Sequence, residues 1–393
     1  MIPGTVFSST NLFYSRLASA LFALGFLLVT NQTPASAQAP DSAADSATFF
    51  YSLDAINSVT PPVTSTDSPT SPTSATSAVV FMYHRFGEGS LPSTNIRIDQ
   101  FESHIAELSS GGYHVLPLPE ILNALREGRG LPDRTVGITI DDGFLSVYTQ
   151  AFPRLQKAGF PFTVFIATDG IDSGNRNLMN WDQVRELAAQ GVTIGAHTAS
   201  HLQMVDSTMS KNREDITRSD ARFHEELGHT PKLFAYPYGE SGLEVAALAK
   251  ASGYEAAFGQ HSGVVYPGAD FFNLPRFALN EKYGTPERFR LVANALPLPV
   301  SDLLPADMAL TNDLTLVGFT VDEGINHIDQ IACFFSIKSQ VMVEHLGGRR
   351  IEVRFADPLP EGRSRLNCTL PGPEERWRWL GMMFYRPTPT PRQ

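Results

Sequence analysis

The sequence predicts an α/β fold, a distorted or incomplete (β/α) barrel, followed by a small all-β sandwich domain. Between residues 78 and 299, about seven short apolar runs alternate with helical stretches over short connections, the pattern of a parallel sheet wrapped by helices. In residues 300–393, short strands follow one another with few helical stretches. With 393 residues, the chain is long enough for each domain to bury a core of its own.

The first 77 residues lack this alternation. In residues 1–37 a single charged residue, Arg16, precedes an apolar run of ~14 residues and an Ala-Ser-Ala cleavage site at 35–37, which is the shape of a signal peptide. Because a spanning helix needs ~20 residues, we expect cleavage, export to the periplasm or outside the cell, and no integral membrane span afterwards. An uncleaved anchor is the alternative. Residues 38–77, rich in Ser, Thr and Pro, are expected to form a disordered linker.

The barrel elements are predicted from their apolar patterns and from the residues that end them. Glycines close several helices, because glycine readily adopts the left-handed conformation of a helix C-terminus, and Asn180 is expected to cap the start of one helix. We expect helices at 99–108, 118–127, 145–157, 181–190, 210–227, 242–251 and 286–296. We expect strands at 78–84, 113–116, 136–140, 162–167, 192–196, 233–236, 254–258 and 272–279.

The strand at 136–140 ends in two adjacent acids, Asp141 and Asp142, followed by Gly143. Its β-branched residues indicate burial on both faces, so the acids fall at the carboxyl end of a parallel strand, where α/β folds place their chemistry. Two neighbouring carboxylates repel each other unless a cation or a shared proton accommodates them. The pair therefore indicates a metal ion.

Two histidines follow the strand at 192–196. His197 and His201 are four residues apart, a spacing that places both imidazoles on one side of a helical turn or tight loop. Together with one carboxylate they would supply three protein ligands and leave positions open for water and substrate, as in catalytic sites. We expect a divalent metal ion, with Zn²⁺ as the default.

The Asp-Asp-Gly and His-x-x-x-His patterns together resemble the polysaccharide deacetylase family of metal-dependent carbohydrate esterases, over about residues 78–297. The resemblance implies a distorted (β/α) barrel and a hydrolase that removes N-acetyl groups from an N-acetylglucosamine-containing polysaccharide and releases acetate. It assigns Asp141 as catalytic base and Asp142, His197 and His201 as metal ligands. Residues 234–239 resemble a third motif of the family, in which a backbone amide near Tyr238 faces the oxyanion.

The sequence departs from the family pattern at two positions. Ala235 stands where many members have an arginine that orients the base, and no Leu-x-His supplies the acid near the end of the barrel. Similar gaps occur in the exported branch that acts on poly-β-1,6-N-acetylglucosamine, whose members open with a strand ending in Met-Tyr-His, as residues 82–84 do here. Arg276 is the expected substitute for the arginine; a surface salt bridge is the alternative.

His84 is the expected general acid for the leaving amine. It follows the first strand of the barrel, whose carboxyl end opens on the same face as Asp141 and His197. A dication and a carboxylate shift the pKa of a nearby imidazole in opposite directions, so this pKa can remain close to 7, where the imidazole can donate a proton and recover one. The alternatives are that His84 fixes the loop after it by hydrogen bonding or serves as a further metal ligand.

In the C-terminal domain we expect strands at 315–321, 331–336, 341–345, 350–355, 364–370 and 377–385, with a hairpin turn at Gly347-Gly348. Trp377 and Trp379 share one strand face, where they either pack in the core or form a platform for sugar. Cys333 and Cys368 form either a disulfide, as export favours, or two buried thiols.

The net charge of −11 argues against nucleic acid and anionic membranes as partners. The family resemblance implies a polysaccharide as the partner. The sequence indicates no oligomeric state. Two other functions fit parts of the pattern. One is an amidohydrolase of the same fold for small cyclic amides, although export and an added β-domain speak against it. The other is a glycan-binding pseudoenzyme, which the intact acids and histidines disfavour.

Overall fold

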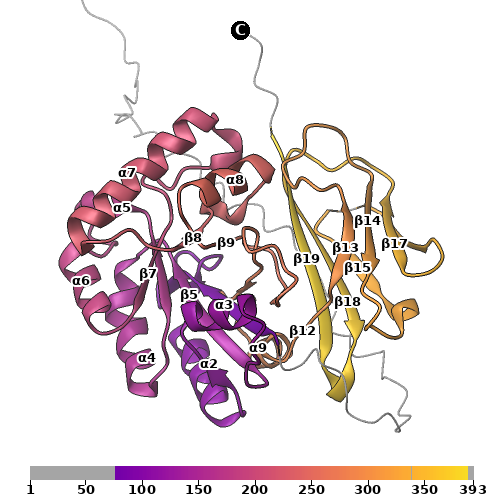
Figure 1. The fold of residues 1–393 in the computed structure, drawn as a ribbon. Helices are drawn as coiled ribbons and strands as arrows, with labels where there is room; N and C mark the ends of the chain where they lie inside the picture. The colour runs from indigo at the N-terminus through magenta and orange to yellow at the C-terminus, as the bar shows by residue number, and fades with distance from the viewer. Residues whose placement is uncertain (1–75, 338, 388–393) are drawn as a thin grey trace, which may run out of the picture. The chain divides into compact units, whose positions relative to one another are not determined.

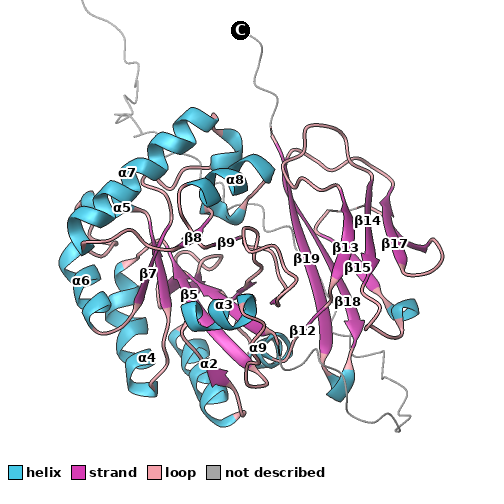
Figure 2. Ribbon diagram, viewed as in Figure 1, coloured by secondary structure: helices cyan, strands magenta, loops and turns pink. Residues whose placement is uncertain are grey.

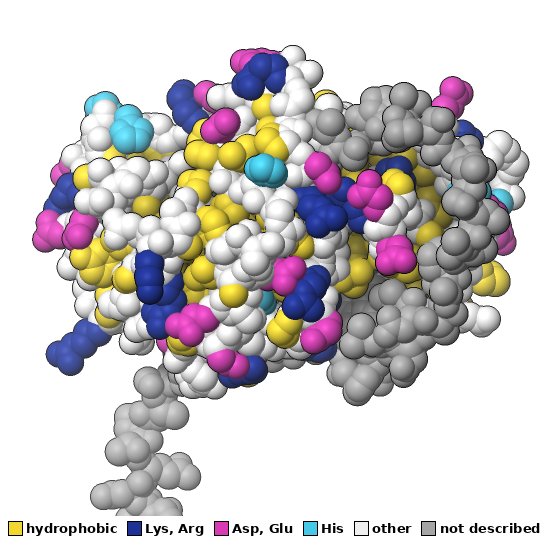
Figure 3. Space-filling model, turned by 90° about the horizontal axis from the view of Figure 1, so that it is seen from below, with side chains coloured by type: hydrophobic (Ala, Val, Ile, Leu, Met, Phe, Trp, Pro, Cys, Tyr) yellow, Lys and Arg dark blue, Asp and Glu magenta, His cyan; other side chains and the backbone are white. Residues whose placement is uncertain are grey.

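The computed structural model describes residues 76–337 and 339–387 (Figure 1). The predicted signal peptide and all but the last two residues of the predicted linker lie outside these ranges. Within them, no helix combines the length and the apolar character needed to cross a membrane. On the face shown in Figure 3, basic and acidic side chains lie among one another.

A parallel sheet forms the centre of the N-terminal part (Figure 2). The strand order is β10-β1-β5-β6-β7-β8-β9, and the hydrogen-bonded pairs from β1 through β9 are parallel. These strands are buried almost throughout, as their β-branched sequences predict. The parallel strands are β1 (Ala78–Tyr83), β5 (Thr135–Asp141), β6 (Thr163–Ile166), β7 (Thr193–Ala196), β8 (Leu233–Ala235) and β9 (Ala256–Phe258).

The segment 274–278 connects the two ends of this sheet. Leu274 forms an isolated parallel bridge with Phe258 at the end of β9. A few residues later, β11 (Phe277–Ala278) pairs in parallel with β1. The sheet therefore curls into a distorted barrel whose seam is this short segment, which confirms the predicted fold class. The expected strand at 272–279 is shorter than predicted, because Pro275 has no N–H to donate to a neighbouring strand.

Most helices pack on the outside of the sheet, where alternate strand residues and the apolar faces of the helices share one core. They are α2 (Ile98–Ser110), α4 (Phe152–Ala158), α6 (Trp181–Ala189), α7 (Met209–Leu227), α8 (Leu243–Ala251) and α9 (Pro286–Ala293). α3 (Leu118–Arg126) differs, because it packs with residues that point into the barrel, such as Val80, Phe165 and Phe258. It thus fills the barrel interior from one end.

Local sequence explains where several helices begin and end. Asn180 caps α6 as predicted: its side chain accepts from the backbone N–H of Gln183 at 2.9 Å. Gly159 ends α4 with a φ of 70°. The helix expected at 145–157 instead begins with a π-helical turn, Val147–Ala151. α9 stops before the predicted residue 296, because Pro297 disfavours a helical conformation at Leu296.

Several short elements were not predicted from the sequence. They are β2 (Arg85–Phe86), β3 (Asn95–Ile96), α5 (Thr168–Asp172), β10 (Val264–Val265), β12 (Leu296–Pro297) and β13 (Val300–Leu304). The first strand ends one residue earlier than expected, and the strand expected at 113–116 is reduced to β4 (His114–Val115). Most of these strands have too few residues to show a period-2 pattern in the sequence, so their pairing depends on the tertiary structure.

The C-terminal part contains two four-stranded sheets, ordered β12-β19-β18-β15 and β13-β14-β17-β16. Side chains from both sheets form one shared core, as the predicted β-sandwich requires. Gly347 and Gly348 lie between β16 and β17 and have positive φ, as expected for the hairpin turn. The strands not yet described are β14 (Leu316–Val321), β15 (Ala332–Phe335), β16 (Val341–His345), β17 (Arg350–Phe355), β18 (Gly362–Pro371) and β19 (Trp377–Arg386).

Cys333 and Cys368 form a disulfide between β15 and β18, where the two residues stand directly opposite each other. Trp379 is buried, with 7% of its surface exposed, and packs edge-on against Phe277 of the barrel. Its indole N–H donates to the Asn367 side chain. Trp377 is only half-buried. The two tryptophans therefore do not form an exposed pair, and Trp379 belongs to the barrel core.

We predict that Trp379→Ala lowers the free energy of unfolding by about 3–5 kcal/mol, the usual cost of truncating a buried aromatic side chain. The half-buried Trp377 provides the matched control, and Trp377→Ala should cost clearly less. Guanidinium titration of both variants measures the difference. Equal losses would contradict the placement of Trp379 in the core.

Candidate active site

Five of the predicted site residues lie at or just beyond the carboxyl ends of parallel strands, and so meet at one edge of the barrel. They are His84 after β1, Asp141 and Asp142 at the end of β5, His197 after β7 and Tyr238 after β8. His201 follows His197 in the same loop, and Arg276 lies on the seam segment 274–278. The structure thus brings all seven residues into one region, as parallel strands require.

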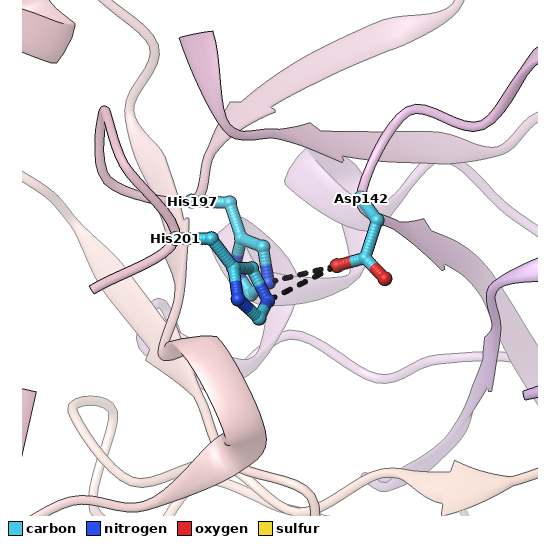
Figure 4. A group of neighbouring side chains, drawn as sticks. All are labelled: Asp142, His197 and His201. Atoms are coloured by element: carbon cyan, nitrogen blue, oxygen red, sulfur yellow. Dashed lines mark ion pairs between the residues drawn. The ribbon is translucent and has the colours of Figure 1, made fainter. Parts of the chain in front are cut away.

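Asp142, His197 and His201 point toward one another (Figure 4). The Nε2 atoms of both histidines lie 3.3 Å from the same carboxylate oxygen, Oδ1 of Asp142. One ligand atom from each of the three residues lies within 4.8 Å of the others, so the group could hold a metal ion. His197 is fully buried, whereas 31% of the His201 side chain is exposed, which leaves the group open to solvent on one side.

The facing atoms of this group are suited to a cation. His197 Nδ1 lies 2.7 Å from the carbonyl oxygen of Ala235, and because a carbonyl only accepts, Nδ1 carries the proton. In the neutral imidazole, Nε2 is then a lone-pair donor. Nε2 of His197 and Oδ1 of Asp142 are both buried without a hydrogen-bond partner, although they lie 3.3 Å apart. A metal ion would satisfy both atoms.

The electrostatics of the group agree with this arrangement. Burial raises the pKa of Asp142, but the contacts with His197 and His201 outweigh burial and hold this pKa well below its usual range. Burial lowers the pKa of His201, and the Asp142 carboxylate more than compensates, so the His201 pKa is raised. Asp142 is therefore ionised near neutral pH and is ready to bind a cation.

The loops that present these side chains have unusual backbone conformations. Asp142, Thr198, His201 and Tyr238 all have positive φ, between 56° and 75°, which costs energy for residues other than glycine. The next residue after Asp142, Gly143, also has a positive φ of 75° and provides the tight exit expected from the sequence. This concentration of left-handed residues aims several side chains at the same point.

Asp215 on α7 stabilises the histidine loop and was not identified from the sequence. Its Oδ1 atom accepts hydrogen bonds from the backbone N–H groups of Ala199 and Ser200, at 2.8 and 3.0 Å. Asp215 is buried on the same helix face as Ile216 and Phe223. An acid on the apolar face of a predicted helix is the signal that could have revealed it.

Arg276 forms a buried, bidentate ion pair with Asp141. Its Nη1 and Nη2 atoms donate to the two carboxylate oxygens at 2.7 and 2.8 Å, and both side chains are fully buried. Arg276 also donates to Thr139 Oγ1 and to the carbonyl oxygen of Gly259. Burial raises the pKa of Asp141, but the charge and hydrogen bonds of Arg276, together with the charges of the neighbouring histidines, outweigh burial and lower this pKa. Arg276 is therefore not a surface residue.

His84 Nε2 lies 4.0 Å from Asp141 Oδ2, and 14% of the His84 side chain is exposed. Burial lowers the pKa of His84, while the two neighbouring acids oppose this shift. Among the described residues, the group that could hold a metal contains Asp142, His197 and His201 but not His84. The structure therefore places His84 beside Asp141 and outside this group of three residues.

Tyr238 lies in a tight turn after β8 (Pro237–Gly239), and its ring packs edge-on against His201 with 4.6 Å between ring centroids. The next residue must be glycine. Gly239 has a φ of 77°, and a Cβ atom there would lie 2.3 Å from the side chain of Gln260. The turn thus brings the backbone of Tyr238 to the edge of the site.

This fold and this set of side chains define a barrel hydrolase with a possible metal centre. Residues 128–257 match the family model described as polysaccharide deacetylase. Residues 128–257 therefore carry a domain that matches polysaccharide deacetylases, hydrolases that act on amide bonds, and the resemblance inferred from the sequence is confirmed.

Individual proteins show the same relationship. A poly-β-1,6-N-acetyl-D-glucosamine N-deacetylase of Staphylococcus epidermidis is 27% identical over 206 residues, covering 49% of this chain and 71% of the relative. The protein of the same name from Staphylococcus aureus is 26% identical over 215 residues, covering 51% and 73%. The structure of Streptococcus pyogenes deacetylase PplD in complex with acetate has a TM-score of 0.52 at 20% identity, covering 56% of this chain and 99% of that one. This last likeness concerns the fold.

We predict that Arg276→Met lowers the free energy of unfolding by about 3–5 kcal/mol, because the Asp141 carboxylate would remain buried without its partner. Urea or guanidinium titration measures this loss. The double variant Asp141→Asn/Arg276→Met removes both charges and should regain part of the lost stability. A double variant less stable than Arg276→Met would contradict this account of the pair.

Proposed function

We propose that this protein is a metal-dependent hydrolase that removes N-acetyl groups from an N-acetylglucosamine-containing polysaccharide and releases acetate. The observation that carries the proposal is the pairing of two groups at one edge of the barrel. Asp142, His197 and His201 present ligand atoms to a common point, those of Asp142 and His197 being buried, and the Asp141–Arg276 ion pair lies next to them. The names of the two staphylococcal relatives support poly-β-1,6-N-acetylglucosamine as the substrate class.

Asp142, His197 and His201 would hold a divalent ion, most simply Zn²⁺, because two imidazoles and one carboxylate suit zinc and leave positions open for catalysis. Such an ion lowers the pKa of water to about 7 and polarises a carbonyl oxygen. The Ala235 carbonyl orients His197 through Nδ1, so that Nε2 remains available as a ligand.

Asp141 is the proposed catalytic base. Arg276 binds both of its carboxylate oxygens, lowers its pKa and sets its orientation, so Asp141 is ionised when it accepts a proton from the attacking water. The same contacts direct Asp141 away from the three proposed ligands. Arg276 thus takes the orienting role that Ala235 cannot fill.

His84 is the proposed general acid. Its Nε2 atom lies 4.0 Å from Asp141 Oδ2, next to the proposed base, and its side chain is partly exposed, so it could give a proton to the leaving amine. The backbone N–H of Tyr238 is proposed to donate to the oxyanion that forms when water attacks the amide, a contact worth roughly 3–4 kcal/mol in comparable sites. The predicted signal peptide supports an exported enzyme, in the periplasm or outside the cell.

Acetate release from a glycan panel tests the proposed function. The panel should contain β-1,6- and β-1,4-linked N-acetylglucosamine oligomers and a small cyclic amide. Each substrate is incubated with the full-length protein after the protein has been loaded with Zn²⁺. Release from the β-1,6-linked oligomers supports the proposal. Turnover of the cyclic amide alone would support a small-molecule amidohydrolase, and metal binding with no turnover of any substrate would contradict an enzymatic role.

We predict that Asp142→Ala, His197→Ala and His201→Ala each lose the metal and acetate release together, because three ligands leave no redundancy. Asp141→Asn should keep the metal while activity falls at least ~10²-fold, the usual scale for a general base. Metal content by mass spectrometry and acetate assays measure both effects. If Asp141→Asn lost the metal and Asp142→Asn retained it, the two roles would be reversed.

We predict that His84→Gln slows deacetylation of a sugar oligomer by ~10²-fold or more but spares hydrolysis of an activated aryl acetate, whose leaving group needs no proton. Metal content should remain unchanged. The test compares the rates of His84→Gln and His84→Ala with the wild-type rate on each of the two substrates. Parallel losses on both substrates, or loss of the metal, would rule out the acid role.

A further inference from the structure

The side chain of Glu240 joins the two loops that carry His201 and Tyr238. Gln203, two residues beyond His201, donates through Nε2 to Glu240 Oε2 at 2.8 Å. Glu240 is itself two residues beyond Tyr238, whose ring packs against His201. His201, Gln203, Glu240 and Tyr238 therefore form a closed ring of contacts along the outer edge of the site.

The β-sandwich binds Glu240 from the other side. Arg363 on β18 donates through Nε and Nη2 to Glu240 Oε1, at 2.9 and 2.6 Å. Only 2% of the Glu240 side chain is exposed, against 24% of the Arg363 side chain, so the Glu240 carboxylate is largely shielded from solvent ions. Burial raises the pKa of Glu240, and Arg363 opposes this rise.

Neighbouring contacts reach the same loops. Tyr385 stands opposite Arg363 in the β18–β19 pair, and its hydroxyl donates to Asp206, in the turn that follows the histidine loop. On the other side of Glu240, Asp307 accepts a hydrogen bond from the backbone N–H of Leu243 at 3.1 Å. The β-sandwich therefore contacts both loops. We call Arg363, Tyr385, Gln203, Glu240 and Asp206 the interdomain clasp.

The two histidines differ in how they are supported. The Ala235 carbonyl orients His197 directly from β8, whereas His201 has a left-handed backbone and packs on Tyr238, itself in a tight turn. The position of His201 thus depends on the loops that the clasp connects. We propose that Arg363 is a positioning residue that holds these loops through Glu240, which makes the β-sandwich part of the active-site structure. The effect on catalysis rests on the proposed function; the effect on the loops does not.

Arg376 offers a matched control. It also joins the β-sandwich to the barrel, with Nη1 2.9 Å from Asp133 Oδ1, and only 7% of its side chain is exposed. Asp133 lies just before β5, at the amino end of the sheet, whereas the site lies at the carboxyl end. Arg376→Ala therefore removes an interdomain ion pair away from the two loops.

The first experiment compares Arg363→Ala, Arg363→Lys and Arg376→Ala in the full chain without metal, by hydrogen exchange and mass spectrometry. We expect Arg363→Ala to speed exchange roughly tenfold in segments 198–206 and 236–243, because local opening becomes easier. Arg363→Lys keeps a cation and should show a smaller change. Arg376→Ala should lower the melting temperature but leave exchange in both segments unchanged.

The second experiment titrates the same variants with Zn²⁺ and then measures acetate release at saturating Zn²⁺. Arg363→Ala should bind Zn²⁺ about tenfold more weakly, at the lower end of the range for residues that support metal ligands. Its kcat should fall about tenfold with KM for a short oligomer unchanged, because the loss affects the reacting geometry rather than substrate binding. Arg376→Ala should match the wild type in both measurements.

Unchanged exchange in both segments of Arg363→Ala, or equal changes in Arg363→Ala and Arg376→Ala, would overturn the positioning role. If Arg363→Ala does not fold, Tyr385→Phe replaces it, because this variant removes only one hydroxyl from the clasp. We then expect faster exchange confined to segment 198–206. Unchanged exchange in that segment would overturn the positioning role of the clasp. Failure of the wild type to release acetate would refute the proposed function alone, since the exchange comparison requires no turnover.

Discussion

The buried ion pair between Asp141 and Arg276 is the interaction on which the rest of the site depends. Two adjacent carboxylates at the end of one strand repel each other, and the structure separates them. Arg276 binds Asp141 inside the barrel, while the left-handed backbone of Asp142 turns its carboxylate toward the two histidines. Because Arg276 lies on the segment between β9 and β1, the residues that close the barrel also orient the proposed base.

The site combines strained loops with a rigid support. Left-handed residues other than glycine cost roughly 1–3 kcal/mol each, and such residues persist only where surrounding contacts determine them. Here Asp215 binds the histidine loop from α7, and Glu240 links that loop to the turn of Tyr238. The side chains that converge on one point are therefore held by hydrogen bonds from elements outside the parallel strands.

The β-sandwich is more closely connected to the barrel than its separate sequence pattern suggests. Trp379 extends the barrel core through Phe277, and β12, in the last residues of the barrel range just after α9, pairs with β19 of the second domain. Arg363 and Tyr385 reach the active-site loops from adjacent strands. We retain 78–299 and 300–393 as the proposed domain ranges, although the contacts between them include groups close to the proposed chemistry.

The sequence by itself determined the alternation of strands and helices, the acids after β5 and the spacing of His197 and His201, because these are local patterns set by backbone geometry. It also identified His84 as a candidate from its place after the first strand, and Arg276, through the family resemblance, as the substitute for a missing arginine. Only the tertiary structure decided that Arg276 binds Asp141, 135 residues away, and that Arg363 binds Glu240 across 123 residues. Such pairings depend on barrel closure and domain packing, and no local period in the chain encodes them. Glu240 escaped prediction for the same reason, since an acid receives its partner only when distant segments meet, whereas Asp215 stands on the apolar face of a predicted helix and could have been recognised there.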